Sequence, residues 1–199
     1  MPSRGAAPSA TAADPRTRIL DAALALMSEQ GSAGASMRQL ATACGLNVAT
    51  IYHYFPSKAD LLRSVMEERR YGERLGTELP DLDPRVAPRE RLVGLLVWLW
   101  DNALAEEAVW RLLVGEALRG EEAATSSASE LVAALAATLE VWLHDGFPEL
   151  GAERDRVAGL ARVVRGQVFA LVVEHLALGA VTPAVARTRA EELAAIVFS

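Results

Sequence analysis

The stretch over residues 36–62 constrains the fold most, because its capping and breaking residues divide it into two short helices and the start of a third. Ser36 and Asn47 favour the N-cap position, where a side-chain oxygen accepts a hydrogen bond from an otherwise unpaired backbone N–H. Gly45 stands where a left-handed residue ends many helices, and Pro56 cannot continue the second helix. Two helices joined by a short turn that contains glycine are typical of a helix-turn-helix.

The second short helix, residues 48–54, has the surface that a DNA recognition helix needs. Ile51 and Phe55 are four residues apart and form an inward apolar stripe. The side chains on the remaining surface are small at the start of the helix and aromatic and polar at its end. Small side chains let a helix approach base edges, while hydroxyl and ring N–H groups can reach phosphates. An ordinary helical hairpin with surface aromatics is the alternative at this point.

Residues 46–62 resemble the signature of the tetracycline-repressor (TetR) family of bacterial transcriptional regulators, and the resemblance extends over residues 16–75. The stretch reads Leu-Asn-Val-Ala-Thr-Ile-Tyr-His-Tyr-Phe-Pro-Ser-Lys-Ala-Asp-Leu-Leu. Asn47 stands where the family more often has serine, Ala49 where it often has glycine, and Ala59 where it often has an acidic residue. Both Asn and Ser can cap a helix, so these departures leave the resemblance intact.

The resemblance implies which residues contact DNA. Arg38 and the first residues of the second helix would face base edges, with Val48 limited to apolar contact such as a thymine methyl. The aromatic residues and the single lysine would meet phosphates. The predicted DNA-binding residues are Arg38, Asn47, Val48, Ala49, Thr50, Tyr52, His53, Tyr54 and Lys58.

Charge is distributed unevenly along the 199 residues, whose net charge is −6. Residues 1–75 hold nine basic and seven acidic residues, a net +2, and residues 76–199 hold eleven and nineteen, a net −8. This weakly favours DNA contact at the N-terminal end. Cys44 is the single cysteine, so no internal disulfide is possible, and it is expected to fill space in a small core. No run of 18 apolar residues is present, so we expect no membrane span and a cytoplasmic protein.

Strand signals are scarce, and we predict an all-α chain of about nine helices from its helical periodicities. The N-terminal residues 1–13 are expected to form a disordered arm. A helix-turn-helix DNA-binding domain with a connecting helix is predicted over residues 14–75, and an effector-binding and dimerisation domain over 76–199. Within the latter, residues 120–129 are predicted to be a loop or a fraying helix start before a helix over 130–144.

The effector prediction rests on the resemblance, because TetR-like proteins hold a ligand cavity inside the C-terminal body. Four tryptophans in this body could each be a core filler or a pocket wall. Polar side chains interleaved with them could orient a small apolar effector. The predicted effector-binding residues are Trp98, Asn102, Trp110, Glu116, Trp142 and Gln167, with His144 as a further candidate.

The dimer prediction rests on a helix expected from residue 152 to 178, which is apolar on nearly all sides and must be buried on nearly all sides. One stripe holds Val164 and Val168, and a second holds Val163 and Phe169. Together with a final apolar helix, this pattern predicts a two-fold four-helix interface, as in TetR-like proteins. A fully buried central helix in a monomer is the alternative. The predicted interface residues are Val164, Val168, Leu171, Val172, His175, Leu193, Ile196 and Val197.

We therefore predict a ligand-responsive DNA-binding transcriptional regulator, most simply a repressor that a small apolar effector releases from a palindromic operator. The resemblance implies that effector binding shifts the connecting helix and changes the separation of the two recognition helices. A helical small-molecule carrier or adaptor, with a helix-turn-helix used for protein contact, is the alternative. No His-x₃-His, cysteine pair or glycine-rich phosphate loop supports an enzyme, and we predict no metal and no cofactor.

Overall fold

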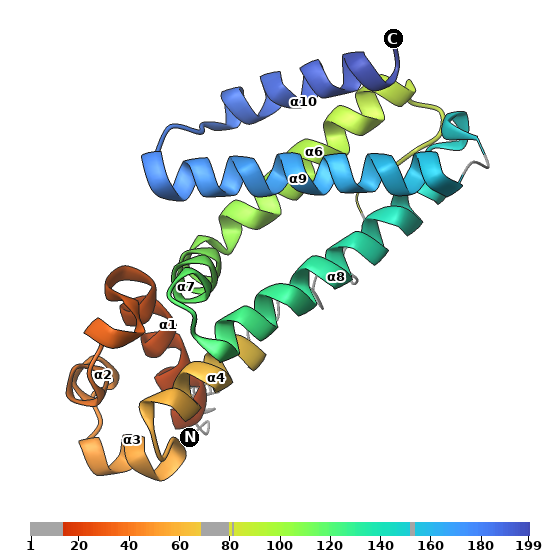
Figure 1. Cartoon of the computed structure of the whole chain (residues 1–199). Coiled ribbons are helices and arrows are strands. Elements are labelled where there is room, and N and C mark those ends of the chain that lie inside the picture. The colour runs from red at the N-terminus through yellow and green to blue at the C-terminus, as the bar shows by residue number, and fades with distance from the viewer. Residues whose placement is uncertain (1–13, 69–79, 81, 152–153) are drawn as a thin grey trace, which may run out of the picture. The chain divides into compact units, whose positions relative to one another are not determined.

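A computed structural model describes residues 14–68, 80, 82–151 and 154–199 (Figure 1). Every regular element in those ranges is a helix, nine α-helices and one 3₁₀ helix, so the predicted all-α class is confirmed. The chain divides into two compact units, residues 1–65 and 66–199. The predicted N-terminal arm and the predicted boundary at residues 75 and 76 lie outside the described residues.

The first unit is built from short helices whose ends the sequence marks clearly. They are α1 (Pro15–Gly34), α2 (Met37–Cys44), α3 (Val48–Tyr54) and most of α4 (Lys58–Glu68). Asp14 occupies the N-cap of α1, but its side chain makes no capping hydrogen bond. Gly31 has φ 74° and ψ 162°, which breaks the regular helix before the last turn of α1.

Side chains cap the next two helices. Ser36 and Gln39 form a reciprocal capping box at the start of α2, in which each side chain accepts from the backbone N–H of the other residue. Asn47 caps α3. Gly45, between these helices, has φ 61° and ψ 35°, the left-handed conformation that glycine adopts without steric cost. The turn of the predicted helix-turn-helix therefore has the geometry that its sequence indicates.

The core of the first unit joins α1 to the helix-turn-helix. The guanidinium of Arg16 lies 5.4 Å from the centroid of the Phe55 ring, and Arg18 donates to the carbonyl of Cys44. The Cys44 thiol lies 3.6 Å from the carbonyl of Arg18, and burial raises its pKa, so the thiol stays protonated in the core. The most deeply buried side chains around them belong to Ile19, Ala23, Met27, Leu40, Ile51 and Leu61.

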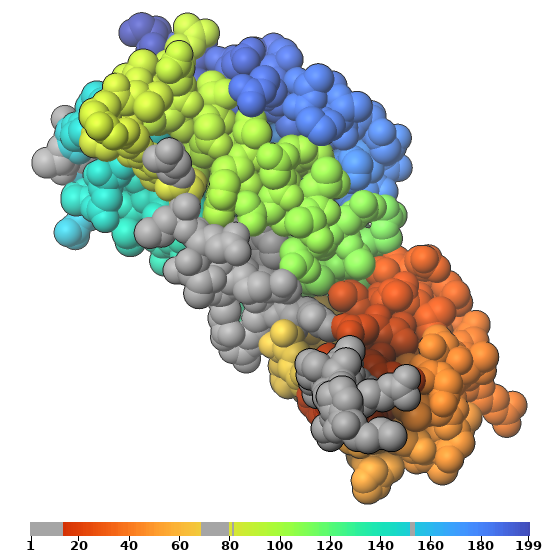
Figure 2. Space-filling model, turned by 180° about the vertical axis from the view of Figure 1, so that it is seen from behind, coloured from red at the N-terminus to blue at the C-terminus, as the bar shows by residue number. Residues whose placement is uncertain are grey.

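The second unit has α6 as its central helix. Its elements are α6 (Pro88–Ala105), α7 (Glu107–Leu118), α8 (Glu122–Gly146), the 3₁₀ helix η1 (Pro148–Leu150), α9 (Arg154–Leu178) and α10 (Pro183–Val197). Helix α6 buries Leu92, Leu95 and Trp100, and both α9 and α10 pack against it. Figure 1 shows these three helices together, and in Figure 2 the yellow-green surface of α6 adjoins the blue surface of the C-terminal helices.

Helix α8 begins at Glu122, so of the two predicted alternatives residues 122–129 form the start of the helix and not a loop. Ala124 is fully buried, and the hydroxyls of Thr125 and Ser129 donate to carbonyls four residues earlier, so the small polar residues follow the helix. By length and a mean hydropathy of 1.2 this helix could cross a membrane. One such helix is weak evidence for a membrane span, and α8 packs against α7 and α9 in the second unit.

Arg91 is buried in the second unit and ties three elements together. Its guanidinium donates to the carbonyl of Gly146 at the end of α8 and forms an ion pair with Glu149 of η1. It also lies over the ring of Phe147, 5.0 Å from the centroid, and this ring stacks on Phe198 at 5.9 Å. A single cation from α6 therefore fixes the turn after α8 and the end of the chain.

Replacing Arg91 with alanine is expected to lower the free energy of unfolding by at least about 1–3 kcal/mol, since the buried carbonyl of Gly146 loses its donor. Urea denaturation followed by circular dichroism measures this loss. Glu149→Gln is the matched control and should cost less than Arg91→Ala, because an amide oxygen still accepts from Arg91 and the bond to the Gly146 carbonyl remains. Equal losses in both variants would show that the ion pair, and not the carbonyl bond, dominates.

A hydrogen bond at the start of α4 predicts that the stability of the fold depends on pH. The Ser57 hydroxyl donates to Asp60 at 2.6 Å, and this bond, aided by Arg63, lowers the pKa of Asp60 below 3.8. Because the folded-state pKa lies below the unfolded value, the ionised carboxylate stabilises the fold above the unfolded pKa, and this contribution is lost as pH falls through the folded pKa. Ser57→Ala should raise the Asp60 pKa in an NMR titration, whereas Ser64→Ala on the same helix should leave it unchanged.

Candidate nucleic-acid interface

The recognition helix α3 has one buried face and one open face. Ile51 is fully buried and Phe55 nearly so, which fixes the helix against the core of the first unit. The opposite face is accessible, with Ala49 and His53 exposed and Tyr52 49% exposed. Val48, Thr50 and Tyr54 are half-buried. Ala49, Tyr52 and His53 thus form the face that a groove could accept, and the half-buried residues lie at its borders.

Asn47 fixes the first turn of this face. Its side-chain oxygen accepts from the Thr50 backbone N–H at 2.7 Å and from the Thr50 hydroxyl at 2.9 Å. The capping role predicted for Asn47 is confirmed by these bonds. Thr50 is therefore held in a single orientation before any partner binds, which reduces the entropy lost on association.

Arg38 and Lys58, the two cations predicted to contact DNA, differ in their surroundings. Arg38 is exposed near the start of α2. The ammonium of Lys58 donates to the carbonyls of Ala33 and Ala35, both at 3.3 Å. An ammonium has three donors, so Lys58 can hold the loop between α1 and α2 and still reach one phosphate.

The structure does not bring the predicted effector residues into one pocket. Trp98 and Trp142 pack edge to face with ring centroids 5.4 Å apart, and the Asn102 amide donates to the Trp98 carbonyl of its own helix. The Glu116 carboxylate is buried and bonded to Arg119 at 2.9 Å. These side chains are engaged in packing and pairing among the described residues, and their grouping in one effector site stays a prediction. Gln167 is half-buried and does not line the cavity described next, and His144 is exposed on α8.

An apolar cavity of about 460 Å³ lies instead between α7, α8 and α9, and Trp110 is the one predicted effector residue that lines it. Its other lining residues are Leu113, Val114, Ala117, Leu118, Ala128, Leu131, Val132, Leu135, Arg165, Gly166, Val168 and Phe169. The sequence prediction missed Arg165 and Gly166. Gly166 could have indicated this site from the sequence, because glycine in the middle of a long helix is unfavourable and is therefore often kept for packing or function.

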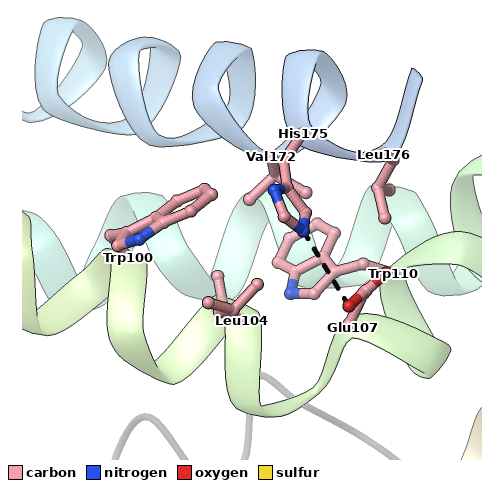
Figure 3. A pocket seen from close by; sticks show the side chains of 8 residues that line it. Trp100, Leu104, Glu107, Trp110, Val172, His175 and Leu176 are labelled. Atoms are coloured by element: carbon pink, nitrogen blue, oxygen red, sulfur yellow. Dashed lines mark ion pairs between the residues drawn. The ribbon is translucent and has the colours of Figure 1, made fainter. Parts of the chain in front are cut away.

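A second, much smaller hollow of about 10 Å³ lies where α6, α7 and α9 meet (Figure 3). His175 lies 3.8 Å from the Glu107 carboxylate and packs edge to face on Trp100, with ring centroids 5.5 Å apart. Its other ring nitrogen is 3.0 Å from the carbonyl of Val181. This space holds at most one water, so His175 serves as a connector between helices and not as an effector contact.

The predicted dimer residues on α9 need correction. Val164, Val168, Leu171 and Val172 are 0–4% exposed within a single chain, so they cannot meet a partner. They lie in the core because α9 packs on α6 and α8. The second stripe is the open one, with Val163 51% and Phe169 47% exposed and Ala170 and Ala177 also exposed. On α10, Ile196 is 76% exposed, while Leu193 and Val197, like His175 on α9, are half-buried.

No group of three or more His, Cys, Asp or Glu side chains in the described ranges could hold a metal ion.

The comparisons with known proteins agree with the helix-turn-helix. A family profile described as "Bacterial regulatory proteins, tetR family" matches residues 19–65. An uncharacterised HTH-type transcriptional regulator of Mycobacterium tuberculosis is 35% identical over 126 residues, which cover 60% of this chain and 58% of that protein. The repressor KstR of Rhodococcus jostii is 49% identical over 51 residues, 26% of this chain and 24% of KstR. The chain thus spans less than two thirds of the length of these relatives.

Among solved structures, Salmonella enterica GusR is similar with a TM-score of 0.67 at 22% identity, over 96% of this chain and 98% of GusR. A TetR-family regulator of Rhodococcus is similar with a TM-score of 0.66 at 18% identity, over 93% of this chain and 98% of that protein. At these identities the likeness shows the fold. The relatives named here by function are transcriptional regulators and not enzymes or carriers, so the carrier alternative is not favoured.

Proposed function

We propose that this chain is a member of the TetR family of bacterial regulatory proteins, whose profile matches residues 19–65, and that it is a cytoplasmic, ligand-responsive repressor that binds a palindromic operator as a homodimer. The observation that carries the proposal is α3 itself. A seven-residue helix is capped by Asn47, anchored by Ile51 and left open on the opposite face. That is the arrangement in which a helix enters a major groove with its N-terminal residues toward the bases.

The proposed roles follow from position and chemistry. Val48, Ala49 and Thr50 open the recognition helix and would face base edges, with Arg38 of α2 beside them. Hydroxyl and ring groups later in the helix would contact the backbone, as would Lys58. Phosphate contacts would set affinity and salt dependence, and base contacts would set sequence preference.

The dimer would form through the exposed stripes of α9 and α10. The two-fold axis would bring each stripe against its own copy. Two recognition helices would then address half-sites roughly 34–36 Å apart or a multiple of that distance. The effector would favour one of two arrangements of the recognition helices. Its unequal affinity for the two arrangements would set the fraction of the protein that is released from the operator.

Two substitutions separate the proposed DNA roles. Arg38→Ala should cost about 1–3 kcal/mol at the cognate site and relax preference there, whereas Lys58→Ala should weaken all duplexes alike and lower the salt slope by roughly one. Fluorescence anisotropy with inverted repeats from the DNA flanking the gene, and with a random duplex, measures both.

Thermal melting of each variant is the control, because Lys58 also bonds the carbonyls of Ala33 and Ala35. Lys58→Ala that keeps its affinity for random DNA but changes sequence preference would contradict these roles. Wild-type protein that binds no flanking repeat and no random duplex would contradict the function itself.

The corrected dimer surface gives a further test. Ala170→Arg adds a charge to the exposed stripe of α9 and should give a folded monomer, whereas Ala170→Ser should remain a dimer. Sedimentation at micromolar concentration measures the state, and anisotropy on the palindrome should show much weaker binding for the arginine variant. A wild-type chain that sediments at 21.3 kDa would refute the dimer.

A further inference from the structure

The cavity between α7, α8 and α9 has the dimensions of a ligand site. Its volume of about 460 Å³ falls within the roughly 300–1,000 Å³ that small-molecule pockets span. Leu113 of α7, Leu131 of α8 and Val168 of α9 all line it. Rim side chains stay exposed, among them Leu118 at 84% and Val132 at 45%, so a molecule can enter from solvent.

Arg165 is the one charged residue among those that line this cavity. It is half-buried, and no carboxylate in the described ranges pairs with it. Arg119 and Arg189 of this unit do have acidic partners, whereas Arg162, on the same helix as Arg165, also forms no ion pair in the described ranges. What sets Arg165 apart is its position: a half-buried guanidinium that lines an apolar cavity and pairs with no carboxylate in the described ranges favours an anionic ligand group.

Gly166, next to Arg165, keeps the wall of the cavity bare. A Cβ built at this position would meet no atom within 4 Å, so packing within the chain does not require glycine. Its backbone is helical, and glycine inside a helix is unfavourable relative to alanine. The missing side chain leaves space beside the guanidinium, where a ligand group could lie.

We propose that this cavity is the effector site and that its ligand is an apolar molecule bearing a single anionic group such as a carboxylate, which Arg165 binds. The anionic group would receive two parallel hydrogen bonds from the guanidinium, and the apolar part would lie between Trp110, Leu131 and Phe169. The ligand class rests on the proposed function, because it names what the regulator responds to.

The test uses the full chain and two probes of equal length, decanoate and 1-decanol, at submicellar concentrations. Tryptophan emission and isothermal titration calorimetry report binding directly, without DNA, so a failure here is distinct from a failure of the operator assay. Decanoate should bind more tightly than decanol. Arg165→Gln should weaken decanoate binding about tenfold to hundredfold and leave decanol binding unchanged.

Two further variants complete the design. Gly166→Leu should fill the cavity and abolish binding of both probes while the melting temperature stays unchanged or rises. Arg162→Gln, an exposed arginine on the same helix that does not line the cavity, should bind decanoate like the wild type. The proposal is overturned if decanoate does not bind, if Arg165→Gln does not discriminate between the probes, or if Gly166→Leu still binds decanoate.

Discussion

The burial of Ile51 and Phe55 is the constraint on which the proposed DNA-binding surface depends. Helix α3 has only seven residues, whereas isolated helices shorter than about 12–15 residues are marginal in water. Its stability must therefore come from the cap at Asn47 and from these two anchors in the core of the first unit. The same core holds α1 through Arg16 over the Phe55 ring. The open face of α3 can carry polar and small residues because it contributes little to holding the helix in place.

The sequence could predict this unit because its determinants are local. Ser36, Gly45 and Asn47 each act within one turn of their own position, and the structure shows all three in the predicted roles. The second unit depends on which faces meet, which no local pattern specifies. Helix α9 carries two apolar stripes, and only the packing of α6 and α8 decides that the stripe with Val164 is core and the stripe with Val163 is exposed.

The tryptophans illustrate the same limit. Large aromatic side chains serve equally well as core fillers and as pocket walls, and their sequence positions do not separate these uses. Trp98 and Trp142 fill space against each other, while Trp110 lines the cavity. The sequence also does not distinguish Arg165 from the many other arginines of the chain. Only the fold shows that it lines an apolar cavity. The residue that could have drawn attention to this region is Gly166, because it weakens a helix without any contact that requires it.

The bond between Asn47 and Thr50 determines what Thr50 can offer to a base. A threonine hydroxyl has one proton, and here that proton points to the Asn47 side-chain oxygen at 2.9 Å. In the proposed complex the hydroxyl could therefore act only as an acceptor. In the major groove the acceptor's partners are the exocyclic amino groups of adenine and cytosine, while guanine O6 and thymine O4 would face a lone pair. The Asn47 cap thus reduces the set of bases that Thr50 could recognise.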